Sequence, residues 1–165
     1  MKKSAPLADQ SVALDRMRYT KNTFSSRMTY LAILFDVLFF VSIYESDVGS
    51  WYYRYIIGIS VVYNLCFMLL AFLASEGVKS YKPGYAVLLM VLGVGQLVRI
   101  FVLPLSAFTT IREGVGLPVM ELPQFIYVTV CLCLSALSCF VAGLVGIDRS
   151  RKLARYNASL ANQPV

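Results

Sequence analysis

The sequence predicts an all-α, polytopic integral membrane protein in which four transmembrane helices form one bundle. Two observations lead to this prediction. Hydrophobic residues make up 58% of the 165-residue chain and charged residues 15%, whereas soluble proteins have about 45–50% and about 25%. Four apolar runs are also long enough to cross a bilayer, which takes about 20 residues in a helix. Because lipid offers no hydrogen bonds to the backbone, each run is expected to be helical.

The four spans divide the chain into three parts. The membrane domain is predicted over residues 28–147, with spans at about 28–44, 55–74, 85–108 and 125–147.

The two flanking segments are expected to lie outside the lipid. Residues 1–27 form the N-terminal segment, in which apolar residues at helical spacing indicate an amphipathic interfacial helix over roughly 12–26. Its basic start is followed by no apolar core before a cleavage site, so we expect the first span to act as an uncleaved insertion signal. Residues 148–165 form the C-terminal tail, which is predicted to extend the last span as a short surface helix.

The distribution of basic residues predicts the orientation. Of the fifteen lysines and arginines, Arg99 falls within a span, Arg54 and Arg112 lie on one side, and the remaining twelve lie on the other. Lysine and arginine are in excess in cytoplasmic loops. Both termini are therefore predicted to be cytoplasmic, and the short tails and loops favour a bacterial plasma membrane.

The composition argues against several classes of function. The chain has no histidine, which excludes histidine bases, histidine-activated nucleophiles and histidine metal sites. All four cysteines lie inside apolar runs without a C-x-x-C pair, so we expect buried thiols rather than redox chemistry. The net charge of +6 comes without a nucleic-acid motif. The sequence thus predicts no enzyme, no metal, no cofactor and no nucleic-acid partner.

Polar residues from the first three spans are expected to meet near the middle of the membrane. At a rise of about 1.5 Å per residue, Asp36 lies about 13 Å and Gln96 about 18 Å from the cytoplasmic edge. Asn64 falls near the middle of its span, and Arg99 lies one turn beyond Gln96. Polar groups at this depth face a bundle interior or a wet cavity. We therefore predict an intramembrane polar layer of Asp36, Asn64, Gln96 and Arg99.

Arg99 needs a partner, because placing an arginine at the centre of a membrane helix costs about 2.5–3.5 kcal/mol on insertion scales. Its side chain leans toward the N-terminal end of its helix, so Asp36 is the expected internal partner. A carboxylate on a partner subunit is the alternative. The matched depths of Asn64 and Gln96 also suggest a hydrogen bond between their amides.

Two interpretations of the polar layer follow. The layer either holds the bundle or a subunit interface together, or lines a path for protons or a solute. Intramembrane charges raise the second possibility by default. Opposite charges that neutralise each other favour the first, although hydrogen bonds inside membranes contribute only about 0.6 kcal/mol on average.

The fourth span carries a stripe of small residues. Cys131, Ser135, Cys139 and Gly143 recur at intervals of four. Such a seam lets helix backbones approach closely. The spacing predicts close packing but leaves open whether the neighbour is a helix of this chain or of another protein.

These observations favour a non-enzymatic integral membrane subunit that assembles with other membrane proteins, as an accessory or scaffold component of a transporter or secretion complex. Its expected partners are the lipid bilayer and other integral membrane proteins, or further copies of itself. The alternative is a small homo-oligomeric transporter or channel that uses Asp36, Gln96 and Arg99 within the polar layer.

Overall fold

A computed structural model describes residues 7–112 and 116–161, with side chains from residue 12 onward except at 47 and 49–60. The outermost parts of the predicted tails, residues 1–6 and 162–165, lie outside the described residues. Every regular element in the described ranges is a helix: α1 (Leu7–Tyr19), α2 (Thr23–Tyr44), α3 (Asp47–Lys79), α4 (Pro83–Val102), α5 (Pro104–Thr109) and α6 (Leu122–Ala161).

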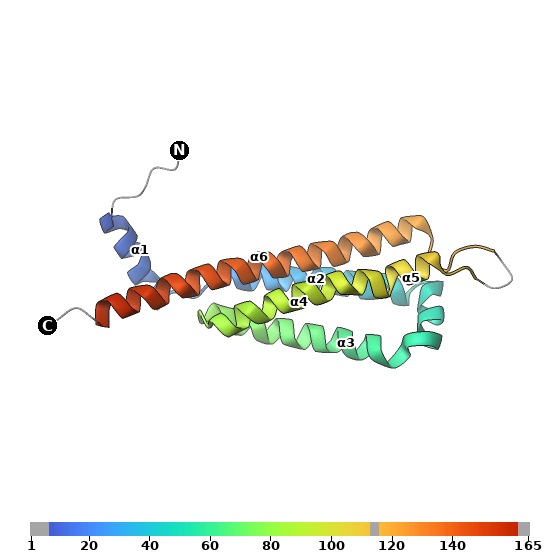
Figure 1. Ribbon diagram of the computed structural model, residues 1–165, viewed down its shortest axis with the longest axis horizontal. Coiled ribbons are helices and arrows are strands. Elements are labelled where there is room, and N and C mark those ends of the chain that lie inside the picture. Colours follow the sequence, from blue (N-terminus) through green and yellow to red (C-terminus); the bar gives the residue numbers. More distant parts are fainter. Residues whose placement is uncertain (1–6, 113–115, 162–165) are drawn as a thin grey trace.

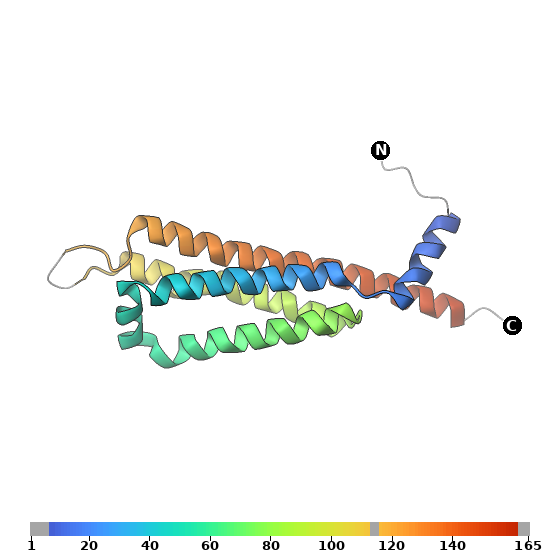
Figure 2. The ribbon, with the colours of Figure 1, turned by 180° about the vertical axis from the view of Figure 1, so that it is seen from behind.

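Four of these segments are long and apolar enough to cross a membrane: Thr23–Tyr44, Val61–Lys79, Pro83–Thr109 and Leu122–Ala161. They run along one long axis (Figure 1), with α6 packed chiefly against α2 and α4. The prediction of an all-helical chain with four segments long and apolar enough to span a membrane is confirmed for the described residues. We call the end that holds α1, the α3–α4 turn and the last turns of α6 the basic end, and the opposite end the loop end. Figure 2 shows the same arrangement from behind.

The N-terminal segment is divided differently from the prediction. Instead of one helix over 12–26, α1 ends at Tyr19 and α2 begins at Thr23. Asn22 lies between them and caps α2, its side chain accepting a hydrogen bond from the Ser25 N–H. Asparagine is a preferred residue at this position because its side chain satisfies an N–H that the first helical turn leaves free. The first membrane helix therefore starts several residues before the predicted span.

The third predicted span is interrupted near the loop end. Helix α4 ends at Val102, and α5 begins at Pro104. Proline has no N–H to donate into the helix, and its ring clashes with the preceding turn. The Leu103 N–H still binds the Arg99 carbonyl at 3.1 Å. The break therefore follows directly after the helical turn that carries Arg99.

Two buried apolar clusters fill the bundle. The cluster toward the loop end contains Phe39, Leu103 and Leu132, and the cluster toward the basic end contains Ala32, Leu92 and Cys139. On α2, α3 and α4, the residues of the predicted polar layer fall between members of the two clusters. The polar layer thus has apolar core on both sides along the bundle axis.

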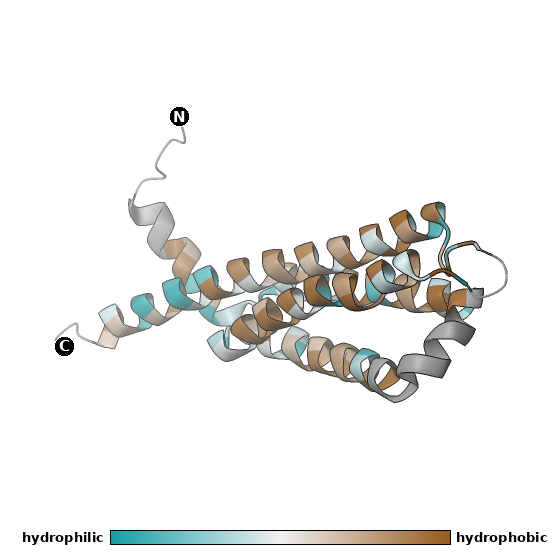
Figure 3. Cartoon of the chain, turned by 45° about the vertical axis from the view of Figure 1, so that its right-hand side comes forward, coloured by the Kyte–Doolittle hydropathy of each residue, from teal (hydrophilic) through white to brown (hydrophobic). Residues whose placement is uncertain are grey.

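Helix α6 is longer than a membrane is thick. Its 40 residues correspond to about 60 Å, twice the roughly 30 Å of bilayer hydrocarbon. Residues 148–161 continue beyond the other helices of the bundle at the basic end (Figure 1), and hydrophilic turns appear in this part of α6 (Figure 3). We call residues 148–161 the stalk. Leu153, Tyr156 and Leu160 lie along it at helical spacing and are only partly buried.

Candidate functional site

The polar layer is a hydrogen-bonded cluster inside the bundle. Arg99 Nη1 lies 2.9 Å from Asp36 Oδ1 and 2.8 Å from Asn64 Oδ1. Gln96 Nε2 donates to the same Asp36 oxygen at 2.9 Å. Helices α2, α3 and α4 therefore meet at one ion pair. The Arg99 side chain is 7% exposed and that of Asp36 is fully buried, so the pair lies within a single chain.

Two aromatic rings flank the Arg99 guanidinium. The Arg99 Cζ atom lies 4.3 Å from the centroid of the Phe39 ring and 5.1 Å from that of Tyr63. The faces of aromatic rings attract cations, and more strongly where water is excluded. The rings replace part of the hydration that a buried guanidinium loses, and they restrict where its plane can lie.

Three buried atoms of the polar layer lack a hydrogen-bond partner in the described structure: Asp36 Oδ2, Asn64 Nδ2 and Gln96 Oε1. Asn64 Nδ2, a donor, and Gln96 Oε1, an acceptor, both lack a partner. The suggested hydrogen bond from the Asn64 amide to the Gln96 amide is therefore absent. Both amides instead bind the ion pair. A buried polar atom without a partner lowers the stability of the fold. These three atoms are therefore the part of the layer best suited to bind a small polar solute.

The small-residue seam lies on the inner face of α6. Cys131, Ser135, Cys139 and Gly143 are all buried, and Ser135 Oγ donates to the Ala32 carbonyl of α2 at 2.9 Å. A Cβ added at Gly143 would lie 2.9 Å from the Ala86 carbonyl oxygen of α4. The contacts along the seam are therefore made by helices of the same chain.

At the basic end, Asn22 joins three helices, which the sequence did not suggest. Its N–H donates to the Lys79 carbonyl at the end of α3 at 3.0 Å, and Arg149 of α6 donates to its side-chain oxygen at 2.8 Å. Asn22 is fully buried. An asparagine before a membrane helix is a readable N-cap signal, but its two long-range partners depend on the tertiary arrangement.

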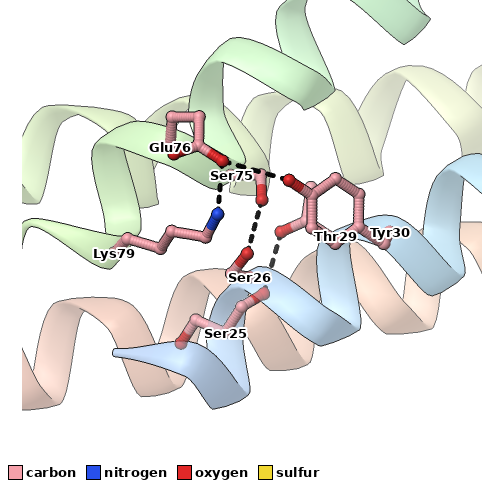
Figure 4. A network of polar contacts seen from close by, with 7 residues as sticks. All are labelled: Ser25, Ser26, Thr29, Tyr30, Ser75, Glu76 and Lys79. Atoms are coloured by element: carbon pink, nitrogen blue, oxygen red, sulfur yellow. Dashed lines mark hydrogen bonds and ion pairs between the residues drawn. The ribbon is translucent and has the colours of Figure 1, made fainter. Parts of the chain in front are cut away.

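A second polar cluster ties α2 to α3 one to two turns inside the basic end (Figure 4). The buried hydroxyls of Ser26 and Ser75 lie 2.7 Å apart. Beside them, Tyr30 Oη donates to Glu76 Oε1 at 3.0 Å, and Lys79 also binds the Glu76 carboxylate. The Ser26–Ser75 bond is shielded from water, whereas the Glu76 contacts are exposed.

Replacing Ser26 and Ser75 with alanine, singly and together, is expected to give a coupling free energy of about 0.6 kcal/mol, the average for hydrogen bonds between membrane helices. Unfolding of the purified protein in mixed micelles measures it. The control pair is Ser26→Ala with Ser138→Ala, because Ser138 binds the Leu134 carbonyl within its own helix. A coupling as small as that of the control pair would contradict the prediction.

Outside the bundle, α1 and the stalk enclose a groove of about 720 Å³. We call it the α1–α6 groove. It is lined by Ala13, Leu14 and Met17 of α1 and by Lys152, Arg155, Tyr156 and Ser159 of the stalk. Apolar side chains thus stand next to two cations in a partly open space at the basic end.

Comparison with models of protein families, with curated proteins and with solved structures finds no match to this chain. Function is therefore inferred from the two sites themselves, the polar layer and the α1–α6 groove.

Proposed function

We propose that this protein is a non-enzymatic integral membrane subunit that assembles with other membrane proteins, as an accessory or scaffold component of a transporter or secretion complex. Its membrane is a bacterial plasma membrane, and both of its termini are cytoplasmic. At the basic end, the stalk by itself carries four basic residues, Arg149, Arg151, Lys152 and Arg155. Cytoplasmic segments next to spans are rich in such residues, which supports this orientation.

The observation that carries the proposal is the stalk. An isolated short helix is marginal in water, yet the last helix continues through residue 161 beyond the bundle. Helix α1 covers only part of its apolar stripe, since Leu153, Tyr156 and Leu160 remain partly exposed. A projecting helix with an incompletely covered apolar face is suited to pack against another protein.

The geometry of the polar layer agrees with a structural role for the membrane part. The Asp36–Arg99 pair is neutral as a unit and lies between two apolar clusters. The guanidinium is bound by Asn64 and flanked by two rings. These contacts favour a fixed element that holds three helices together, so the surface for assembly is sought elsewhere on the chain.

The test is purification of the tagged protein from native membranes in mild detergent, followed by mass spectrometry. We expect a membrane protein to be recovered in stoichiometric amount. A variant that ends after Ile147, checked for membrane insertion and folding, is expected to lose it. A chain that remains stable and monodisperse without any partner at native expression would contradict the proposal.

A small homo-oligomeric transporter or channel is the second candidate. It is favoured by the unpartnered Asp36 Oδ2, Asn64 Nδ2 and Gln96 Oε1 atoms, which offer two acceptors and one donor to a proton carrier or a small polar solute. If this candidate is correct, proteoliposomes should show a flux that the double variant Asp36→Asn/Arg99→Gln abolishes. A flux that survives in a folded double variant would remove this candidate.

A further inference from the structure

We propose that the α1–α6 groove binds an acidic amphipathic segment of a partner protein on the cytoplasmic side. The inference rests on the proposed function and names the surface and the chemistry of the contact. It starts from the lining of the groove, in which Leu14, Met17 and Tyr156 supply apolar surface and Lys152 and Arg155 supply positive charge. A ligand that fits must carry both apolar and acidic groups.

The size of the groove fits a few side chains. Its volume of about 720 Å³ lies within the range of roughly 300–1,000 Å³ in which proteins bury drug-sized ligands. An amphipathic helix laid into a groove contributes anchors at positions i, i+3, i+4 and i+7. Two or three such anchors, with acidic residues beside them, would occupy this space.

The groove lies away from the lipid, as the position of its lining residues along α6 indicates. Arg149 binds Asn22 where α2 begins, at the level of the α3–α4 turn. Lys152 and Ser159 lie roughly 5 and 15 Å farther along the stalk, which continues the long axis of the bundle (Figure 1). The groove therefore lies beyond the ends of α2 and α3, where a protein segment can reach it more readily than an acyl chain.

Charge also argues against a second copy of this chain as the occupant. The stalk contains four basic residues and one acidic residue, Asp148, so it carries a net positive charge. Two stalks would repel each other, whereas an acidic segment would be attracted. Lys152 is bound to Asp148 at 2.6 Å, but this pair is largely exposed, with side chains 58% exposed on both sides. Exposed pairs of this kind contribute little, so Lys152 can exchange its partner.

The test uses the full-length protein in its native membrane. A photo-crosslinking amino acid, p-benzoylphenylalanine, is placed at Ser159 in the groove and, as a control, at Ala154. Ala154 is exposed and lies about 140° away around the helix. We expect a specific protein adduct from position 159 and none from position 154, with the attached peptide rich in aspartate and glutamate and carrying apolar residues at helical spacing.

Charge reversal tests the electrostatic part of the contact. The double variant Lys152→Glu/Arg155→Glu is expected to lower the adduct yield on the order of tenfold, because two favourable contacts become repulsive. The matched control Lys21→Glu/Lys82→Glu makes the same change of net charge at exposed residues of the basic end outside the groove. It is expected to leave the yield unchanged, and membrane topology is verified in both variants.

Several outcomes would overturn the inference. An adduct with a lipid, with another copy of this chain or with a peptide lacking excess acidic residues would do so, and so would equal labelling from both positions or no adduct. Copurification separates this failure from that of the proposed function. A stoichiometric partner that is recovered but never labelled from the groove refutes only the groove contact, whereas the absence of any partner refutes both.

Discussion

Replacing Asp36 with leucine is expected to lower the free energy of unfolding by about 3–5 kcal/mol, the cost of removing one member of a buried ion pair. Arg99 would then be a buried charge that has lost the carboxylate of Asp36. The double variant Asp36→Leu/Arg99→Met is expected to recover most of the loss, since apolar replacement of a whole buried pair is often neutral or stabilising.

Unfolding in mixed micelles measures both effects, with Val98→Leu as the control. Val98 is 54% exposed on the outer face of α4 and should tolerate the change with little effect. If the double variant lost as much stability as the sum of the two single variants, Asp36 and Arg99 would not be energetically coupled. The polar layer would then owe its stability to the amides and the rings.

Replacing Gly143 with alanine is the second change for which a large effect is expected, a loss of about 1–3 kcal/mol. The added Cβ would lie 2.9 Å from the Ala86 carbonyl oxygen and 2.9 Å from Met90 Cγ. Backbone oxygen cannot move aside as a flexible side chain can, so α6 and α4 would have to separate.

Gly84→Ala is the matched control, because a Cβ at Gly84 meets nothing within 4 Å. Removing a helical glycine without a clash should leave stability unchanged or raise it by about 0.4–1 kcal/mol. Thermal unfolding in detergent compares the two variants. Equal stability of both would show that the close approach of α6 to α4 is not needed for the fold.

The sequence was sufficient to predict the four long apolar helices, because lipid imposes a simple rule on the composition and length of a segment that can cross it. It was weaker at helix ends. The predicted helix over 12–26 crosses the junction at Asn22, since apolar periodicity continues on both sides of a cap and does not mark the residue where the chain changes direction. The predicted span over 85–108 likewise runs through the break at Pro104, where the proline interrupts the helix.

The sequence was sufficient to predict the depth of the polar layer in the membrane, but not all of its hydrogen bonds. Asp36 and Arg99 were suggested as partners from their positions along their helices, and the structure brings them within 2.9 Å. The roles of Asn64 and Gln96 depend on how the three helices rotate about their axes, which depth does not reveal. The contacts of Arg99 with the rings of Phe39 and Tyr63 could not be predicted for the same reason. In a sequence, an aromatic residue within an apolar span looks like any other core or lipid-facing residue, and only the structure shows the cation beside it.

The buried ion pair also restricts how this sequence can evolve. If a change at Asp36 or Arg99 alone is costly while a joint change is tolerated, the two sites are strongly epistatic. A lineage passing through either single replacement would carry a destabilised protein, and losses of even 1–2 kcal/mol alter protein abundance in cells. Descendants should therefore keep both residues or lack both. The pair can then persist over long evolutionary times because each single replacement destabilises the protein. This holds whether or not the pair ever binds a solute.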